Sequence, residues 1–107
     1  MNDRSGPRVQ PARAVAFDVL RAVNESDAYA NLLLPTAIDR AGLNGSDAGL
    51  ATELTYGTLR RLCYYDAVIE LAARRSPEDI DPVVLDARRL STHQILSMRV
   101  AEHAAVN

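Results

Sequence analysis

The chain of 107 residues is 48% hydrophobic and has a formal net charge of −2, which fits one small domain with a modest core. This composition excludes a wholly disordered chain, and the apolar runs are too short for a transmembrane helix. The single Cys63 excludes an internal disulfide framework and a cysteine-based zinc site. The N-terminal residues lack the apolar stretch of a signal peptide, so we expect a cytoplasmic protein.

The first residues in chain order are predicted to form a mobile basic arm over residues 1–10, because they are polar and aperiodic. A helical domain is expected over residues 11–107. Its first helix has Pro11 in the first turn, where a missing N–H group does no harm, and is ended by the polar residues 24–27. Apolar residues at helical spacing predict its buried face: Ala12, Val15, Ala16, Val19, Leu20 and Val23.

The second and third helices are predicted from their terminal residues. One covers residues 32–41, with Asn31 as its N-cap and Gly42 as its C-cap. The next begins after Ser46 and runs to about residue 62. Gly57 lies inside this helix without a turn signal, so we expect it to allow a second backbone to come close.

A fourth helix is predicted over residues 66–74, and it could be separate from the third or its bent continuation. Asp81 and Pro82 fit the N-cap and the first position of a fifth helix that extends to about residue 98. No segment alternates with the period of a β-strand, so the predicted fold is all-α. The buried stripe of the fifth helix is expected to contain Val83, Val84, Ala87, Leu90, Ile95 and Met98.

The sequence offers no convincing catalytic or metal site. Cys63 with His93 or His103 could pair a thiol with a base, but a lone helical cysteine beside apolar and aromatic residues is usually an inert small hydrophobe. The two histidines have no further ligand at metal-binding spacing. Acidic residues 78, 79 and 81 precede a helix, where capping and solvation explain them.

A cluster of arginine and tyrosine residues is the best candidate for a binding surface. Arg60, Arg61 and Tyr64 lie within one helical turn, and arginine beside an aromatic ring suits stacked bases and phosphates of single-stranded RNA. All twelve basic residues are arginine, which binds phosphate through a planar fork. The alternative is that Tyr65 packs in the core and the arginines pair with Asp66 or other acids. The arginine pairs 74–75 and 88–89 are expected to be solvated helix faces.

Five segments together resemble the NusB-like RNA-binding fold, and in particular the N-terminal domain of the RsmB (Sun/Fmu) class of ribosomal RNA methyltransferases. They are residues 12–20, Asn31-Leu32-Leu33-Leu34-Pro35, residues 53–60 with Glu53, Gly57 and Arg60, Asp66 with its apolar neighbours, and His103-Ala-Ala-Val-Asn107. The resemblance implies a bundle of about seven helices, of which about five are present here. It also implies RNA contacts by Arg8 and Arg13 at the entry to the first helix, and more weakly by Arg4.

The family resemblance implies an RNA-binding accessory domain of an enzyme that methylates a cytosine at C5 of small-subunit ribosomal RNA. The catalytic domain and its S-adenosylmethionine would lie outside this chain, which is expected to be a C-terminally incomplete fragment without catalytic site, cofactor or metal. One alternative is a transcription antitermination factor that binds RNA together with a ribosomal protein. Another is a helical protein-interaction module or a truncated remnant, which the sequence pI of about 5.6 favours.

Overall fold

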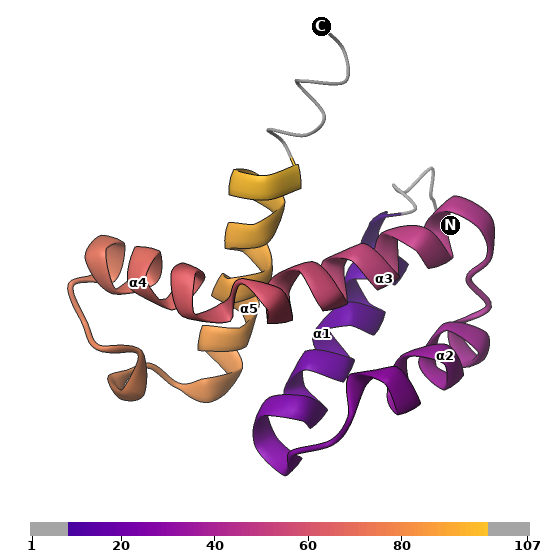
Figure 1. The fold of residues 1–107 in the computed structure, drawn as a ribbon, viewed down its shortest axis with the longest axis horizontal. Helices are drawn as coiled ribbons and strands as arrows, with labels where there is room; N and C mark the ends of the chain where they lie inside the picture. Colours follow the sequence, from indigo (N-terminus) through magenta and orange to yellow (C-terminus); the bar gives the residue numbers. More distant parts are fainter. Residues whose placement is uncertain (1–8, 99–107) are drawn as a thin grey trace, which may run out of the picture. The chain divides into compact units, whose positions relative to one another are not determined.

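The computed structural model describes residues 9–98, and these residues are helical throughout apart from short connections (Figure 1). No β-strand occurs among the described residues, which confirms the all-α prediction. The chain divides into two compact units, residues 1–56 and 57–107, and the division falls within α3. The elements in chain order are α1 (Val9–Ser26), α2 (Ala30–Ala41), α3 (Gly45–Arg60), α4 (Leu62–Ala73), the 3-10 turn η1 (Pro77–Asp79), α5 (Pro82–Thr92) and the π-helix η2 (His93–Met98).

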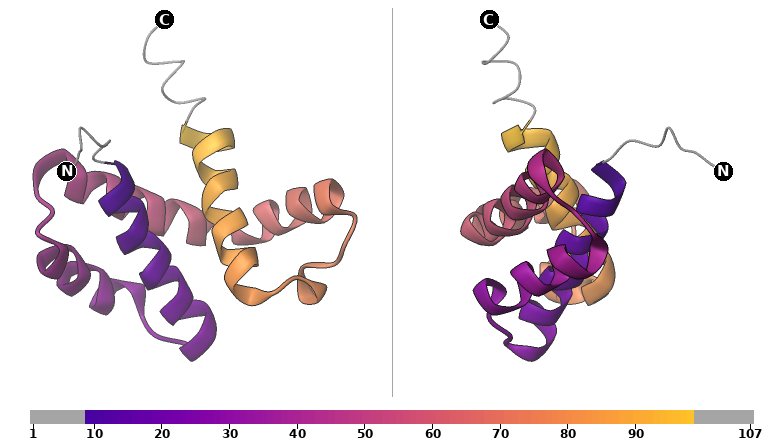
Figure 2. Two further views of the ribbon diagram at one scale, coloured as in Figure 1. Left: turned by 180° about the vertical axis from the view of Figure 1, so that it is seen from behind. Right: turned by 90° about the vertical axis from the view of Figure 1, so that its right-hand side faces the viewer.

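The first unit is built on the predicted apolar face of α1, which packs against α2 (Figure 2). Every predicted residue of this face is buried except Val23, which is half-buried. Leu34 of α2 and Leu54 of α3 are buried in the same unit. The helix α1 already begins at Val9, so residues 9 and 10 belong to it and not to the predicted arm. Residues 1–8 of that arm lie outside the described residues.

The predicted end of α2 is confirmed, whereas α2 and α3 each start two residues before the predicted position. Gly42 has a φ of +73° and its N–H donates to the carbonyl of Asp39, as a glycine C-cap does. Asn31 lies inside α2, because the carbonyl of Tyr29 accepts the first helical hydrogen bonds and no side chain caps this end. Ser46 likewise lies inside α3, because the carbonyl of Asn44 accepts from the N–H of Asp47.

The third and fourth helices are separate. Arg61, with φ −115° and ψ 24°, departs from helical geometry and divides α3 from α4, which therefore starts four residues before the predicted Asp66. In the second unit, α4 and α5 pack against each other and enclose a small apolar core of Ile69, Ile80 and Leu85. Gly57, at the start of this unit, is buried, and the close approach of a second backbone at this residue stays a prediction.

The N-terminus of α5 is capped as predicted, but its buried stripe is not the predicted one. Of the six stripe residues only Leu90 is fully buried, whereas Val83, Val84 and Ile95 are 48%, 42% and 57% exposed. Ala87 and Met98 are half-buried. The prediction failed because two polar side chains occupy inward positions that an apolar pattern cannot reveal. The residues on the inward face are Leu85, Asp86, Leu90 and His93.

Replacing Asp81 with alanine should lower the free energy of unfolding by about 1 kcal/mol, because this side chain caps α5. Its Oδ1 accepts hydrogen bonds from the N–H groups of Val83 at 2.9 Å and Val84 at 3.4 Å. Urea unfolding followed by circular dichroism measures the change. Asp79→Ala is the matched control, since this exposed carboxylate lies in η1; equal losses for the two variants would contradict the capping role.

Candidate functional site

The predicted arginine–tyrosine cluster lies at the junction of α3 and α4, within the second unit. Arg60 is the last residue of α3, Arg61 occupies the break between the helices, and Tyr64 belongs to the first turn of α4. All three residues are exposed, and 59% of Tyr64 is accessible to solvent. We call Arg60, Arg61 and Tyr64 the arginine–tyrosine patch.

The patch keeps one of its predicted spacings and loses another. Arg61 and Tyr64 are three residues apart at the start of one helix, a spacing that places side chains on neighbouring parts of the helix surface. Arg60 belongs to the preceding helix, so it does not share one continuous helical turn with Tyr64 as expected. The patch is therefore centred on Arg61 and Tyr64.

Tyr65, the next residue, is completely buried and anchors α4 to η2, which confirms the alternative that placed it in the core. Its hydroxyl group lies 2.7 Å from Nδ1 of His93 and 2.5 Å from Oγ of Ser97. The ring of Tyr64 packs against that of Tyr65, with centroids 5.7 Å apart and an angle of 47° between the ring planes. Burial of Tyr65 thus fixes which side of α4 carries the exposed ring.

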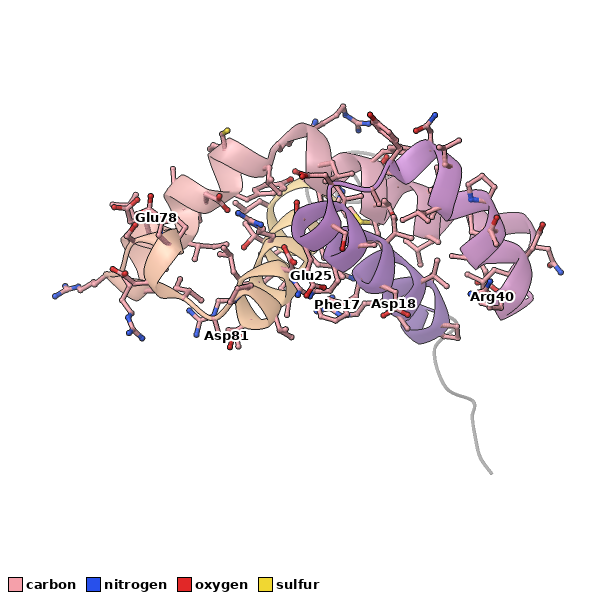
Figure 3. All side chains as sticks on the ribbon, turned by 90° about the horizontal axis from the view of Figure 1, so that it is seen from below. Phe17, Asp18, Glu25, Arg40, Glu78 and Asp81 are labelled. Carbon is pink, nitrogen blue, oxygen red and sulfur yellow. The ribbon has the colours of Figure 1, made fainter. Side chains whose placement is uncertain are left out.

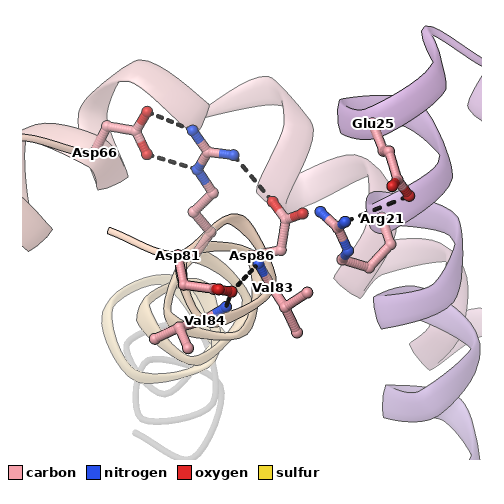
Figure 4. A network of polar contacts seen from close by, with 8 residues as sticks. Arg21, Glu25, Asp66, Asp81, Val83, Val84 and Asp86 are labelled. Atoms are coloured by element: carbon pink, nitrogen blue, oxygen red, sulfur yellow. Dashed lines mark hydrogen bonds and ion pairs between the residues drawn. The ribbon is translucent and has the colours of Figure 1, made fainter. Parts of the chain in front are cut away.

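A second anchor between α4 and α5 is an ion pair that the sequence analysis missed. Asp66 and Arg89 form two hydrogen bonds, from Nε to Oδ1 and from Nη2 to Oδ2, each 2.7 Å long (Figure 4). A third, of 2.9 Å, joins Nη1 of Arg89 to Oδ1 of Asp86. The side chains of Arg89 and Asp86 are only 13% and 1% exposed.

This ion network corrects two predictions. Asp66 pairs with Arg89 from the other helix and not with the patch arginines. Arg89 was predicted on a solvated face with Arg88, but it lies against α4 while Arg88 is exposed. The hydrogen bonds with Asp66 raise the pKa of Arg89 above its ordinary value, although burial opposes this, so the guanidinium stays charged. Only the i,i+3 spacing of Asp86 and Arg89 could have signalled the network in the sequence.

The remaining predicted RNA contacts belong to the N-terminal part of the chain. Arg13 lies in α1 and is half-buried. Arg4 and Arg8 lie outside the described residues. In the same unit, Arg21 forms an ion pair of 3.4 Å with Glu25 (Figure 4). Arg40 is exposed near the end of α2 (Figure 3).

The described residues do not assemble a metal site or a thiol–imidazole pair. Across residues 9–98, no three His, Cys, Asp or Glu side chains are grouped to hold a metal ion. Cys63 is exposed, contrary to its predicted apolar surroundings, and His93 is buried against Tyr65. His103 lies outside the described residues. None of the helices in the described part of the chain has the length and apolar character needed to cross a membrane.

Comparison with known proteins decides the family. The sequence model of the NusB family matches residues 10–107. The chain belongs to the NusB family. A provisionally named methyltransferase of Mycobacterium tuberculosis is 56% identical over the whole of this chain, which spans 24% of that relative. No solved structure matches the chain.

Two further relatives of this NusB-family chain are more distant. Both are provisionally named ribosomal RNA small subunit methyltransferase B; the one from Bacillus subtilis is 31% identical over 89% of the chain, and the one from Synechocystis is 33% identical over 90%. The chain spans 21% and 22% of their lengths. The resemblance stated from the sequence is thereby confirmed. The match covers only about a fifth of each of these two relatives.

Replacing Arg89 with methionine should lower the free energy of unfolding by about 3 kcal/mol, because the buried Asp86 carboxylate loses this charged partner. Chemical unfolding of the purified chain measures the loss. The adjacent Arg88→Met is the control, and this exposed position should change stability by less than about 0.5 kcal/mol. If both variants lower the free energy of unfolding by the same small amount, the ion network does not stabilise the fold.

Removing the Tyr65 hydroxyl with Tyr65→Phe should cost about 1–3 kcal/mol, because polar groups of His93 and Ser97 lose their buried partner. Tyr64→Phe removes the same atom from an exposed ring and should leave the unfolding midpoint nearly unchanged. Thermal unfolding of the two variants side by side tests the difference. A larger loss from Tyr64→Phe than from Tyr65→Phe would show that the buried hydroxyl does not anchor α4.

Proposed function

We propose that this NusB-family chain is an RNA-binding accessory domain of a ribosomal RNA (cytosine-C5) methyltransferase. The names of the relatives support this function, since two of them refer to methylation of small-subunit ribosomal RNA. S-adenosylmethionine would be used by a catalytic domain, and the described residues of this chain would contribute binding and not chemistry. The proposed partner is small-subunit ribosomal RNA, and the proposed location is the cytoplasm.

The observation that supports RNA binding most directly is the exposure of the arginine–tyrosine patch. The Tyr64 ring is 59% exposed and provides a surface on which an unpaired base can stack. Arg61 lies one helical turn away and can neutralise a phosphate of the same nucleotide segment, and Arg60 adds a second exposed guanidinium group. These features suit a flexible single strand, whose bases and phosphates are both accessible.

Arg13 and Arg8 enter the proposal through the family resemblance, as contacts at the entry to α1. Arg4 is a further contact of the same kind. The antitermination alternative, in which a ribosomal protein binds together with RNA, shares the RNA-binding step. The methyltransferase names of the relatives favour the first function over this one.

The patch predicts a specific loss of RNA affinity. Tyr64→Ala should weaken binding of fluorescein-labelled oligouridine by about 5- to 100-fold, the range expected when one stacked base loses its aromatic partner. Arg61→Gln should lower the slope of log affinity against log salt by about 0.7, the value for one phosphate contact of a single strand. Fluorescence anisotropy over a series of salt concentrations measures both.

Two exposed residues of the first unit provide matched controls. Tyr29 is 71% exposed and Arg40 is exposed near the end of α2. Tyr29→Ala and Arg40→Gln should bind oligouridine as the unaltered chain does. If the control variants lose as much affinity as the patch variants, binding is a general effect of charge and aromatic content, and the patch is not the site.

Competition with fragments of small-subunit ribosomal RNA tests the proposed substrate class. A fragment that contains the substrate region should displace oligouridine at lower concentration than an unrelated RNA of equal length. Equal displacement would support a general RNA-binding role and contradict preferential binding of small-subunit ribosomal RNA by this chain.

A further inference from the structure

The π-helix η2 directly follows α5 and is joined to α4 by one buried hydroxyl group. This group belongs to Tyr65, and its two partners, His93 and Ser97, lie at the start and near the end of η2. The phenol can donate to one partner and accept from the other, so both hydrogen bonds can form at once. Helices of the π type are rare and are frequently found at functional sites, which directs attention to what η2 holds in place.

The side chain of Tyr65 is fixed both at its ring and at its hydroxyl group. The ring is completely buried, and the ring of His93 meets it edge-on, with centroids 5.7 Å apart and an angle of 61° between the planes. Hydrogen bonds are directional, so two partners at the hydroxyl group define the tilt of the ring as well as its depth. The side chains of η2 therefore determine how the Tyr65 ring is oriented.

That orientation is passed on to the exposed ring of the arginine–tyrosine patch. The Tyr64 and Tyr65 rings are in contact in a tilted arrangement, which is one of the geometries that aromatic pairs favour. Tyr64 is 59% exposed, and an exposed side chain without such a contact exchanges rapidly between rotamers. A ring that is already held in one orientation binds a base with a smaller loss of conformational entropy.

We propose that η2 positions the RNA-binding ring of Tyr64. Its residues His93 and Ser97 act through the Tyr65 hydroxyl and are positioning residues, which themselves need no contact with RNA. This inference rests on the proposed RNA-binding function and adds a means by which η2 regulates the affinity of the patch. Release of η2 from Tyr65 lowers that affinity while every group that contacts RNA is still present.

A change at Ser97 tests the proposal in the full chain. Ser97→Ala should weaken binding of fluorescein-labelled oligouridine by about two- to tenfold, the effect of having to order one side chain upon binding. The slope of log affinity against log salt should stay the same, because no phosphate contact is lost. Ser97→Thr keeps the hydroxyl group and should restore the affinity. Unchanged affinity of Ser97→Ala would overturn the proposal.

Thr92→Ala is the matched control on the neighbouring turn. The Thr92 hydroxyl donates to the carbonyl of Arg88 at 2.7 Å and is not a partner of Tyr65. This variant should bind oligouridine as the unaltered chain does. An equal loss of affinity in Thr92→Ala and Ser97→Ala would show a general effect of removing a hydroxyl group from this helical segment, and would contradict a specific role of Ser97.

A double-mutant cycle separates positioning from a merely structural role. Ser97→Ala should have no further effect on affinity in a chain that already carries Tyr64→Ala, because the ring that it positions is gone. It should likewise add nothing to Tyr65→Phe, which removes the shared hydroxyl group. Circular dichroism at the temperature of the binding measurement verifies that each variant is folded. The same loss of affinity with and without Tyr64 would overturn the proposal.

The same measurements distinguish a failure of this inference from a failure of the proposed function. If Tyr64→Ala weakens oligouridine binding and Ser97→Ala does not, the patch binds RNA and only the role of η2 is wrong. If Tyr64→Ala leaves the affinity unchanged, the patch is not the RNA site, and both proposals fail.

Discussion

The ion network of Asp66, Arg89 and Asp86 is the interaction on which the second unit depends. A buried carboxylate such as Asp86 is costly unless a charged group compensates it, and Arg89 does so while it also binds Asp66 with both nitrogens of one edge. Apolar packing alone allows helices to slide and rotate, whereas a two-point hydrogen bond has one geometry. The network therefore sets the rotation of α4 against α5, and the Tyr65 hydroxyl bonds reinforce the same setting.

That fixed rotation links the fold to the proposed RNA-binding surface. With Tyr65 turned inward, Tyr64 and Arg61 remain at the surface beside the α3–α4 break. With Arg89 turned inward, its neighbour Arg88 remains exposed. The acidic net charge of the whole chain is compatible with this arrangement, because binding depends on local groups and not on the total. The NusB family membership and the relatives' names then favour RNA as the ligand of the patch.

The sequence predicted those features that depend on local chemistry. The spacing of apolar residues in α1, the C-cap Gly42 and the N-cap Asp81 each follow from interactions within a few residues, and each is confirmed. The predicted buried stripe of α5 was wrong because Asp86 and His93 are buried against α4, whose residues are distant in sequence. Arg89 was misplaced for the same reason. Burial of Tyr65 could be predicted only as one of two alternatives, because its partners His93 and Ser97 are distant in sequence.

Backbone amide chemical shifts of the ¹⁵N-labelled chain, recorded during titration with oligouridine, test the central claim most directly. The account predicts that the largest changes fall on residues 60–64 at the α3–α4 junction, and that the amides of α5 change little. Changes concentrated on α5, or spread evenly over exposed arginines of both units, would contradict the assignment of the arginine–tyrosine patch as the RNA-binding surface.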